Sequence, residues 1–452
     1  MALNELIHKL IHIFFDELSI QSVDNISSCP IYIYIYFKVL YNINTIYNST
    51  LRPDVYIAWY NTLKVFLIGQ RYTIPYVLFI THQNIMSLLF KNYSKTHLKS
   101  VDFGVAEISL VNPRGNLKDA LLEYVKYIYD QHVSLINGVH SSIKYDWGQP
   151  ADFTGKPDYK PYDPYVWIPL VLPVGNNTFI DVNYPATYKV QELFGKNYEH
   201  TIPSLDLSEI EMRIQKLKGS LPFLFEQKVD DVYRIYEATF FSKSNPLFYI
   251  FRLCTDLNIK FMVPIDNQIN YYYALSNVTY NTACTLFTLK NKYNIPRPIT
   301  INRNIYKNSS VNIWYNNSGN STGNFWLPIN DFNLVCPAYP DCPNENSTFV
   351  TALGYVLKKI YLSQNLYDSV TQTNSPSNGI DKLLGKHSIS TEQFPYLSVL
   401  TNTSVEYDII VRDIDDLVDK YKMADSILGI SYSESCEIGY ELGKLIGTTM
   451  VG

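Results

Sequence analysis

Hydrophobic positions at the start of the chain recur with the spacing of an α-helix. The apolar residues of this stripe are Leu3, Leu6, Ile7, Leu10, Ile11, Phe14 and Leu18. They predict an amphipathic helix that packs on its own domain, with docking of a partner protein as the alternative. Residues 30–41, PIYIYIYFKVLY, instead alternate Ile with Tyr. This alternation predicts a β-strand at Ile31–Tyr36, either on a sheet edge within the chain or at an interface between chains.

Longer segments with helical periodicity cover much of the remaining chain. They lie at residues 54–90 (as two runs), 117–137, 229–257, 271–292, 348–366 and 405–424. Ser208 and Glu211 have the spacing of a capping box, which predicts the start of a further helix that Gly219 closes. His82, in the second run of residues 54–90, is expected to be a core histidine. The pattern predicts a mainly α protein with a small β element near its N-terminus.

Segments with few periodic apolar positions predict the loops. Residues 147–170 carry five prolines among aromatic residues, which predicts a long, stiff surface loop, with a linker between domains as the alternative. Residues 301–325 are polar and rich in Asn, and residues 369–378 are rich in Ser, Thr and Asn. Both predict irregular structure. We divide the chain into an N-terminal arm, residues 1–45, and one helical domain, residues 46–452.

The composition is that of a globular protein with an unusual abundance of tyrosine. Charged residues make up 17% of the chain and aromatic residues 15%, with 39 Tyr among the 452 residues. The formal net charge of −5 gives no basic surface for nucleic acid, so nucleic-acid binding is not expected. Asn, Ile, Tyr, Lys and Phe have codons rich in A and T, and their abundance indicates an AT-rich genome, such as that of a large DNA virus or a protist.

Targeting and cysteine patterns narrow the expected location. The first 18 residues contain acidic and basic side chains, so no secretory signal is predicted. No uncharged apolar run reaches the roughly 18 residues of a membrane span, and we expect a protein of the cytoplasm or of a virus particle. Cys336 and Cys342 are the only closely spaced cysteines, and they form either a disulfide or two free thiols.

Three segments of the C-terminal half carry the candidate chemistry. Residues 336–349, CPAYPDCPNENSTF, form a proline-rich loop followed by residues that cap helices, and such a loop resembles an anion-binding helix N-terminus. In the second segment, KNKYNIPRP, Lys290 is followed by Arg297 and Pro298. The third, residues 425–447, is a short apolar turn followed by a helix that contains glycines.

Taken in chain order, the three segments resemble the vanadium-dependent haloperoxidases, which share their helical fold with the type 2 phosphatidic acid phosphatases. The family signature is KxxxxxxRP, then PSGH, then RxxxxxH before a closing helix. Lys290 and Arg297 match the first motif. The resemblance implies a helical-bundle domain in which Lys, two Arg and loop N–H groups hold an oxyanion, vanadate or phosphate. One His bonds vanadium and another moves a proton.

This chain departs from the signature at the other site positions. Asn344 stands where the family has Ser, Glu345 where it has Gly, and Asn346 where it has the acid–base His. Asp425 stands at the second Arg, and Ser431 at the vanadium-bonding His. An amide cannot act as a general acid at neutral pH, and a hydroxyl is a far weaker metal ligand than an imidazole. The sequence therefore predicts a site without catalytic residues and without a bound metal or cofactor, closed by internal ion pairs.

Two features could carry other chemistry. His387 lies between the second and third motifs, and either approaches the pocket or is a loop histidine. Asp415, Asp416 and Asp419 form DDLVD, which is similar to a magnesium motif of prenyl-diphosphate enzymes, but an acidic solvated helix face explains it better.

The first functional hypothesis is an inactive haloperoxidase-like protein that serves as a structural or interaction component, specifically of a large DNA virus particle, through self-association or a larger assembly. Abundant tyrosine is typical of protein interfaces. The alternative is an active vanadate-dependent haloperoxidase or acid phosphatase with an altered site.

Overall fold

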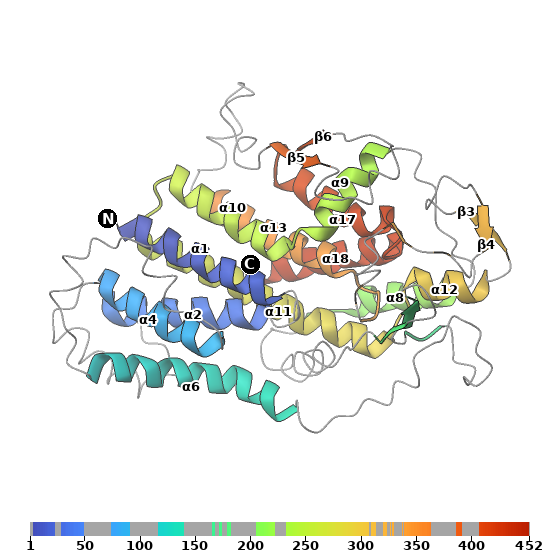
Figure 1. The fold of residues 1–452 in the computed structure, drawn as a ribbon. Coiled ribbons are helices and arrows are strands. Elements are labelled where there is room, and N and C mark those ends of the chain that lie inside the picture. The colour runs from blue at the N-terminus through green and yellow to red at the C-terminus, as the bar shows by residue number, and fades with distance from the viewer. Residues whose placement is uncertain are drawn as a thin grey trace. The chain divides into compact units, whose positions relative to one another are not determined.

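The secondary structure is mainly helical, as predicted (Figure 1). The structure, a computed structural model, describes residues 3–22, 29–48, 74–90, 116–139, 165–167, 171–173, 179–181, 205–221, 232–306, 309–312, 320–322, 326, 328–329, 337, 339–362, 386–390 and 406–451. The helices are α1 (Leu3–Ser22), α2 (Cys29–Asn48), α4 (Ile74–Leu89), α6 (Asn116–Val139), α8 (Ser208–Ser220), α9 (Val232–Lys243), α10 (Pro246–Lys260), α11 (Ile265–Tyr293), α12 (Pro298–Ile305), α13 (Glu345–Leu362), α17 (Ile414–Ile427) and α18 (Ser433–Val451).

The described strands form three small antiparallel pairs. Strand β1 (Val171–Pro173) pairs with β2 (Phe179–Asp181), β3 (Ser310–Asn312) with β4 (Asn320–Thr322), and β5 (Lys386–Ser390) with β6 (Glu406–Ile410). The longest pair places His387 opposite Ile409 and Ser388 opposite Asp408. Two-stranded ribbons of this size depend on neighbouring structure for their stability.

The chain forms two compact units whose boundaries lie inside helices. Unit 1 comprises Met1–Ser142 and Cys254–Tyr280, and unit 2 comprises Ile143–Leu253 and Asn281–Gly452. The chain passes between the units within α10 and within α11. The division at residue 45 into an arm and one domain stays a prediction.

Unit 1 has an aromatic core. Helix α4 packs against α1, α2 and α6. The ring of Phe14 on α1 stacks on Tyr36 of α2 with 4.0 Å between centroids, and the Tyr36 hydroxyl lies 2.7 Å from Nδ1 of His82. Burial lowers the pKa of His82 to about 3, so its ring is neutral. His82 is therefore the core histidine that the sequence predicted, and residues 3–22 form the predicted amphipathic helix, with Phe14 and Leu18 in its buried face.

The prediction of a strand at Ile31–Tyr36 is wrong, because these residues lie in helix α2. Ile31, Ile33, Ile35, Tyr34 and Tyr36 are all buried. Alternation of Ile with Tyr is an alternation of residue type and not of polarity, so it does not select the two-residue period of a half-buried strand. The tyrosines of this segment pack within the chain. Tyr34, for example, stacks on Tyr280 at 4.7 Å.

Unit 2 is built around the packing of α13 on α18. Small residues make this contact close. A Cβ atom added to Gly439, Gly443 or Gly447 of α18 would lie 2.5–2.9 Å from backbone oxygens of α13 or of the residue that precedes it. These oxygens belong to Asn344, Thr348 and Ala352, respectively. Because residue numbers increase in the same direction along both helices, the two helices run parallel. Helix α17 packs against α9, α13 and α18.

Three further predictions of local structure are wrong. Residues 406–410, predicted as helix, form strand β6, and the helix begins only at Ile414, where the Asp413 carboxylate accepts a hydrogen bond from Asp416 N. Residues 301–305, predicted as loop, belong to α12, which Pro298 opens at its first turn. Ser208 and Glu211 form no capping box. The Asp206 carboxylate accepts from Ser208 N instead, and Glu211 pairs with Lys292 at 2.6 Å.

Several predictions lie outside the described residues. They include the first helical run of residues 54–90, most of residues 147–170, and residues 369–378. Within the described part of the chain, no helix combines the length and the apolar character that crossing a bilayer requires.

Candidate functional site

Two helix ends hold the cations of the first motif. Lys290 lies in the last turn of α11, and Asn294 ends that helix in the left-handed conformation, with φ 50°. Asn tolerates this conformation better than most residues. Arg297 then precedes α12 in an extended conformation, and Pro298 is the first residue of that helix. The spacing KxxxxxxRP therefore spans one helix end, one turn and the next helix start.

Lys290 is fully buried, and its ammonium group lies close to three oxygen atoms. Its Nζ donates to the carbonyl oxygens of Pro340 at 2.8 Å and Asp341 at 2.6 Å, and it pairs with Glu345 Oε2 at 3.1 Å. Burial lowers the pKa of Lys290, while the neighbouring Glu345 opposes that shift. Three acceptors around one ammonium match its three hydrogen atoms, so we assign Lys290 as a cation.

Arg297 is also buried and binds the loop between α12 and α13. Its Nε donates to the Tyr339 carbonyl at 3.0 Å, and its Nη1 contacts Asp341 Oδ1 and the Ile430 carbonyl, both at 3.3 Å. Its Nη2 lies 3.6 Å from Glu345 Oε1. Arg297 thus pairs with two carboxylates and joins the first motif to the other two.

The proline-rich loop leads into the N-terminus of α13. The Asn344 side chain accepts a hydrogen bond from Ser347 N at 2.9 Å, which caps the helix, and Glu345 is the first helical residue. The helix therefore begins three residues before the predicted start at Thr348. Glu345 also accepts from the Tyr339 hydroxyl at 2.8 Å.

The end of α17 explains the apolar turn of the third motif. Gly429 has φ 73°, the left-handed conformation that favours glycine, and its N–H bonds the Ser426 carbonyl. Ile430 N donates to the Asp425 carbonyl, which completes a Schellman motif. This turn directs the Ile430 carbonyl and the Ser431 hydroxyl toward Arg297, at 3.3 Å and 3.4 Å.

Asp425 is buried and accepts hydrogen bonds from three polar side chains. Ser242 of α9 donates to Oδ1 at 2.6 Å, and the amides of Asn344 and Asn346 donate to Oδ2 at 2.8 Å and 3.2 Å. Burial and the nearby Glu345 raise the pKa of Asp425 to about 6, although the hydrogen bonds from Ser242 and Asn344 oppose the shift.

The structure brings all seven predicted positions into one network, in which every member except the half-buried Asn346 is buried: Lys290, Arg297, Asn344, Glu345, Asn346, Asp425 and Ser431. Burial alone would raise the pKa of Glu345, but Lys290 and Arg297 outweigh it and hold that pKa below its usual value. Glu345 is therefore ionised beside two cations.

Three residues of this network were missed by sequence reasoning. Asp341 is fully buried, pairs with Arg297, and accepts from Tyr432 N at 3.3 Å. Tyr339 places its ring 5.1 Å from Lys290 Nζ and 5.2 Å from the Arg297 guanidinium. Buried cations require anionic partners, so the sequence could have predicted that Asp341, in the loop beside these motifs, pairs with Lys290 or Arg297. We find no sequence signal for Ser242.

The arrangement does not fit vanadate or phosphate. Both cations are paired with carboxylates of the chain, and the described part of the network contains three carboxylates and no imidazole. Ser431 accepts a hydrogen bond from the Asn344 amide at 3.0 Å, and Asn346 donates to Asp425. A tetrahedral oxyanion would have to displace Glu345 from Lys290 and approach two other carboxylates.

The remaining candidates lie elsewhere. His387 is on strand β5. Asp415 and Asp419 on α17 are exposed and pair with Lys358 and Lys422, as expected for a solvated acidic face. Cys342 is a buried free thiol, whereas Cys336 lies outside the described residues.

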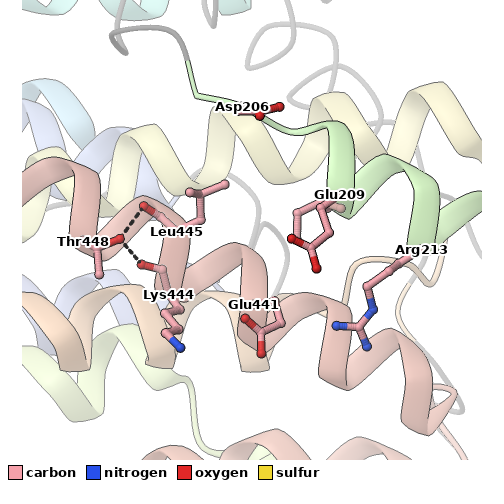
Figure 2. A pocket seen from close by; sticks show the side chains of 8 residues that line it. Asp206, Glu209, Arg213, Glu441, Lys444, Leu445 and Thr448 are labelled. Atoms are coloured by element: carbon pink, nitrogen blue, oxygen red, sulfur yellow. Dashed lines mark hydrogen bonds between the residues drawn. The ribbon is translucent and has the colours of Figure 1, made fainter.

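A surface pocket lies between α8 and α18 (Figure 2). Its volume is about 230 Å³, and its lining residues are Asp206, Glu209, Ile210, Arg213, Glu441, Lys444, Leu445 and Thr448. Arg213 donates to Glu434 at 2.8 Å. The pocket shares no residue with the buried network, and its mixed charges give it no single preferred ion.

Comparisons with known proteins agree with this architecture. Residues 270–452 match the family described as the VCPO second helical-bundle domain. A solved bacterial vanadium-dependent iodoperoxidase is similar with 12% identity and a TM-score of 0.55 over 99% of this chain and 96% of that chain. A holo-type bacterial vanadium-dependent chloroperoxidase is similar with 12% identity and a TM-score of 0.57, over 94% and 91% of the two chains.

An apo-type bacterial vanadium-dependent chloroperoxidase is similar with 11% identity and a TM-score of 0.57, over 95% and 94% of the two chains. No curated protein matches the sequence. At such identities the structural likeness establishes the fold. Together with the match over residues 270–452, it confirms the predicted resemblance and the helical-bundle class.

Proposed function

We propose that this chain, a member of the vanadium haloperoxidase superfamily by its fold and by the match of residues 270–452, is a non-catalytic protein with a structural or interaction role. The ion pairs of Glu345 with Lys290 and Arg297 carry this proposal. A unit charge at about 4 Å is worth roughly 4 kcal/mol at an effective dielectric constant near 20. The Glu345 carboxylate therefore opposes any second anion at Lys290, 3.1 Å away.

The hydrogen bonds of the two positions that replace histidines support the same proposal. Asn346 donates its amide hydrogen to Asp425, and Ser431 lies between Asn344 and Arg297. The Asn346 amide cannot act as a general acid at neutral pH, and the Ser431 hydroxyl is a far weaker ligand than an imidazole. We therefore expect no peroxide chemistry and no bound vanadate.

Peroxide-dependent bromination tests this proposal. The purified protein is incubated with orthovanadate and assayed beside an active haloperoxidase, and vanadate binding is measured by equilibrium dialysis. Phosphatase activity is measured on a simple aryl phosphate. We expect neither turnover nor vanadate binding. Turnover would overturn the proposal in favour of an active haloperoxidase or acid phosphatase with an altered site.

We further propose that the protein is a component of a large DNA virus particle, through self-association or a larger assembly. The 39 tyrosines support this role, as does the abundance of amino acids whose codons are rich in A and T. Light scattering after gel filtration measures self-association, and quantitative mass spectrometry of purified particles measures copy number. A monomer in solution that is also absent from particles would contradict the proposal.

A further inference from the structure

The Glu345 carboxylate occupies the meeting point of donors from three separate elements. Lys290 Nζ of α11 lies 3.1 Å from Oε2, the Arg297 guanidinium before α12 lies 3.6 Å from Oε1, and the Tyr339 hydroxyl of the loop donates to Oε1 at 2.8 Å. Glu345 is also the first residue of α13, where free backbone N–H groups and the helix dipole favour negative charge. Such convergence is typical of a binding site for a small anion.

The donors are held in place by contacts that do not involve Glu345. Lys290 remains bonded to the carbonyls of Pro340 and Asp341, and Arg297 to the carbonyls of Tyr339 and Ile430. The Tyr339 ring contacts Phe287 edge-to-face with 5.8 Å between centroids. The donor set should therefore keep its geometry without the carboxylate.

We infer that the Glu345 side chain is a tethered anion that fills a latent site for a tetrahedral oxyanion, so that removing this one side chain creates a binding site for inorganic phosphate. The side chain has five heavy atoms, as many as phosphate, and substitution by glycine removes all five together with one negative charge. The inference rests on the proposed function, because both require that the wild-type site is closed.

Two other carboxylates set the conditions under which the emptied site binds an anion. Asp341 is paired with Arg297 at 3.3 Å and offsets its charge when ionised. Asp425, whose pKa is raised chiefly by burial, is ionised at high pH. With Glu345 removed and Asp425 protonated, Lys290 and Arg297 leave one net positive charge. Asp425 should therefore oppose anion binding less at pH 5.5 than at pH 8, and the test uses pH 5.5, where inorganic phosphate is mainly the monoanion.

The experiment measures the melting temperature of Glu345→Gly at pH 5.5 with increasing inorganic phosphate, at constant ionic strength set with chloride. We expect a rise of about 3 °C or more at phosphate concentrations far above the dissociation constant. The wild-type protein and Glu345→Gln, which keeps the shape of the side chain, should not respond. Glu434→Gly is the matched control, because Glu434 also lies in the first turn of a helix and pairs with an arginine, Arg213, but its side chain is 45% exposed.

Each outcome decides the inference. A folded Glu345→Gly or Glu345→Ala protein whose melting temperature responds to phosphate no more than wild type would overturn it. If both variants fail to fold in chloride, refolding in phosphate but not in chloride supports it, and failure in both overturns it. Phosphate binding or bromination by the wild-type protein would instead show that the proposed function is wrong. An inert wild-type protein with unresponsive variants would remove only this inference.

Discussion

At the scale of single residues, Asp425 carries a carboxyl group whose charge is disfavoured by burial in the folded protein. Its carboxyl is buried, and its raised pKa means that the folded chain holds this proton more tightly than the unfolded chain does. The group therefore costs no stability below pH 4 and reduces stability progressively as pH rises through 6. A shift from 3.8 to about 6 corresponds to about 3 kcal/mol at 1.36 kcal/mol per pH unit.

Asp425→Asn should stabilise the protein at pH 7.5 by about 1–3 kcal/mol and have little effect at pH 4. The amide oxygen of the new residue can still accept from Asn344 and Asn346, and its NH₂ group can donate to the Ser242 hydroxyl. Urea unfolding at both pH values measures the difference between variant and wild type. Equal destabilisation at both would show that the ionised carboxylate is needed.

Lys290→Met should destabilise the protein by about 3–5 kcal/mol, because it leaves the Glu345 carboxylate buried with one cation fewer. The double variant Lys290→Met with Glu345→Gln should recover much of that loss, since no uncompensated charge remains. Chemical denaturation of the two variants and of Glu345→Gln alone gives the coupling energy. A loss of less than about 1 kcal/mol for Lys290→Met would contradict the expected importance of the pair.

At the scale of elements, the contact between α13 and α18 depends on glycines that face a backbone. Gly443 lies so close to α13 that an added Cβ atom would be 2.5 Å from the Thr348 carbonyl oxygen and 2.8 Å from Thr351 Cβ. A backbone oxygen inside a helix cannot rotate away, so the helices would have to separate.

Gly443→Ala should therefore destabilise the protein by at least about 2 kcal/mol, although alanine favours helix formation. Gly219→Ala in α8 is the matched control, because an added Cβ atom at Gly219 meets nothing within 4 Å. We expect this control to stabilise the protein by about 0.4–1 kcal/mol. Thermal and urea denaturation give both values, and similar effects of the two substitutions would refute the close-packing account.

The sequence predicted which elements are helical better than it predicted where they begin. Helices α1, α4, α6, α11 and α18 follow from apolar periodicity and glycine content. The prediction failed at α2, where most of the described side chains are buried, and at β6, whose five residues were merged with the following helix. In both cases the period of the apolar pattern does not separate the two structures.

For the site, the seven positions that the motif spacing grouped lie together in the structure, because two helix ends and a capped helix fix that spacing. Asp341 and Tyr339 were missed because burial of a loop residue depends on packing from other elements. In this case the packing comes from α11 and from the turn after α17.

At the scale of the whole molecule, the two compact units share helices. The boundaries at Leu253 and at Tyr280 fall inside α10 and α11, and both residues are buried. A linker between domains is normally exposed and irregular. The units are therefore joined by continuous secondary structure.

Within residues 246–293, limited thermolysin digestion should cut the turn between α10 and α11, where Met262 is 82% exposed with φ 47°, before it cuts either helix. Cleavage needs local unfolding, which costs more inside a buried helix than at an exposed turn. Mass spectrometry of the first fragments identifies the sites, with a digest in urea as the control. Early cleavage near Leu253 or Tyr280 would show that the shared helices open easily.

The glycines of α18 also fix how far that helix can slide. Gly439, Gly443 and Gly447 recur every four residues and meet α13 positions with the same interval. If α18 moved along α13 by one residue, Tyr440 or Lys444 would lie against the α13 backbone, where only glycine fits. The helix can therefore shift only by about one helical turn, which brings the next glycine into place. Small translations are thereby forbidden, and the turn that carries Ser431 into α18 keeps its position relative to Asn344.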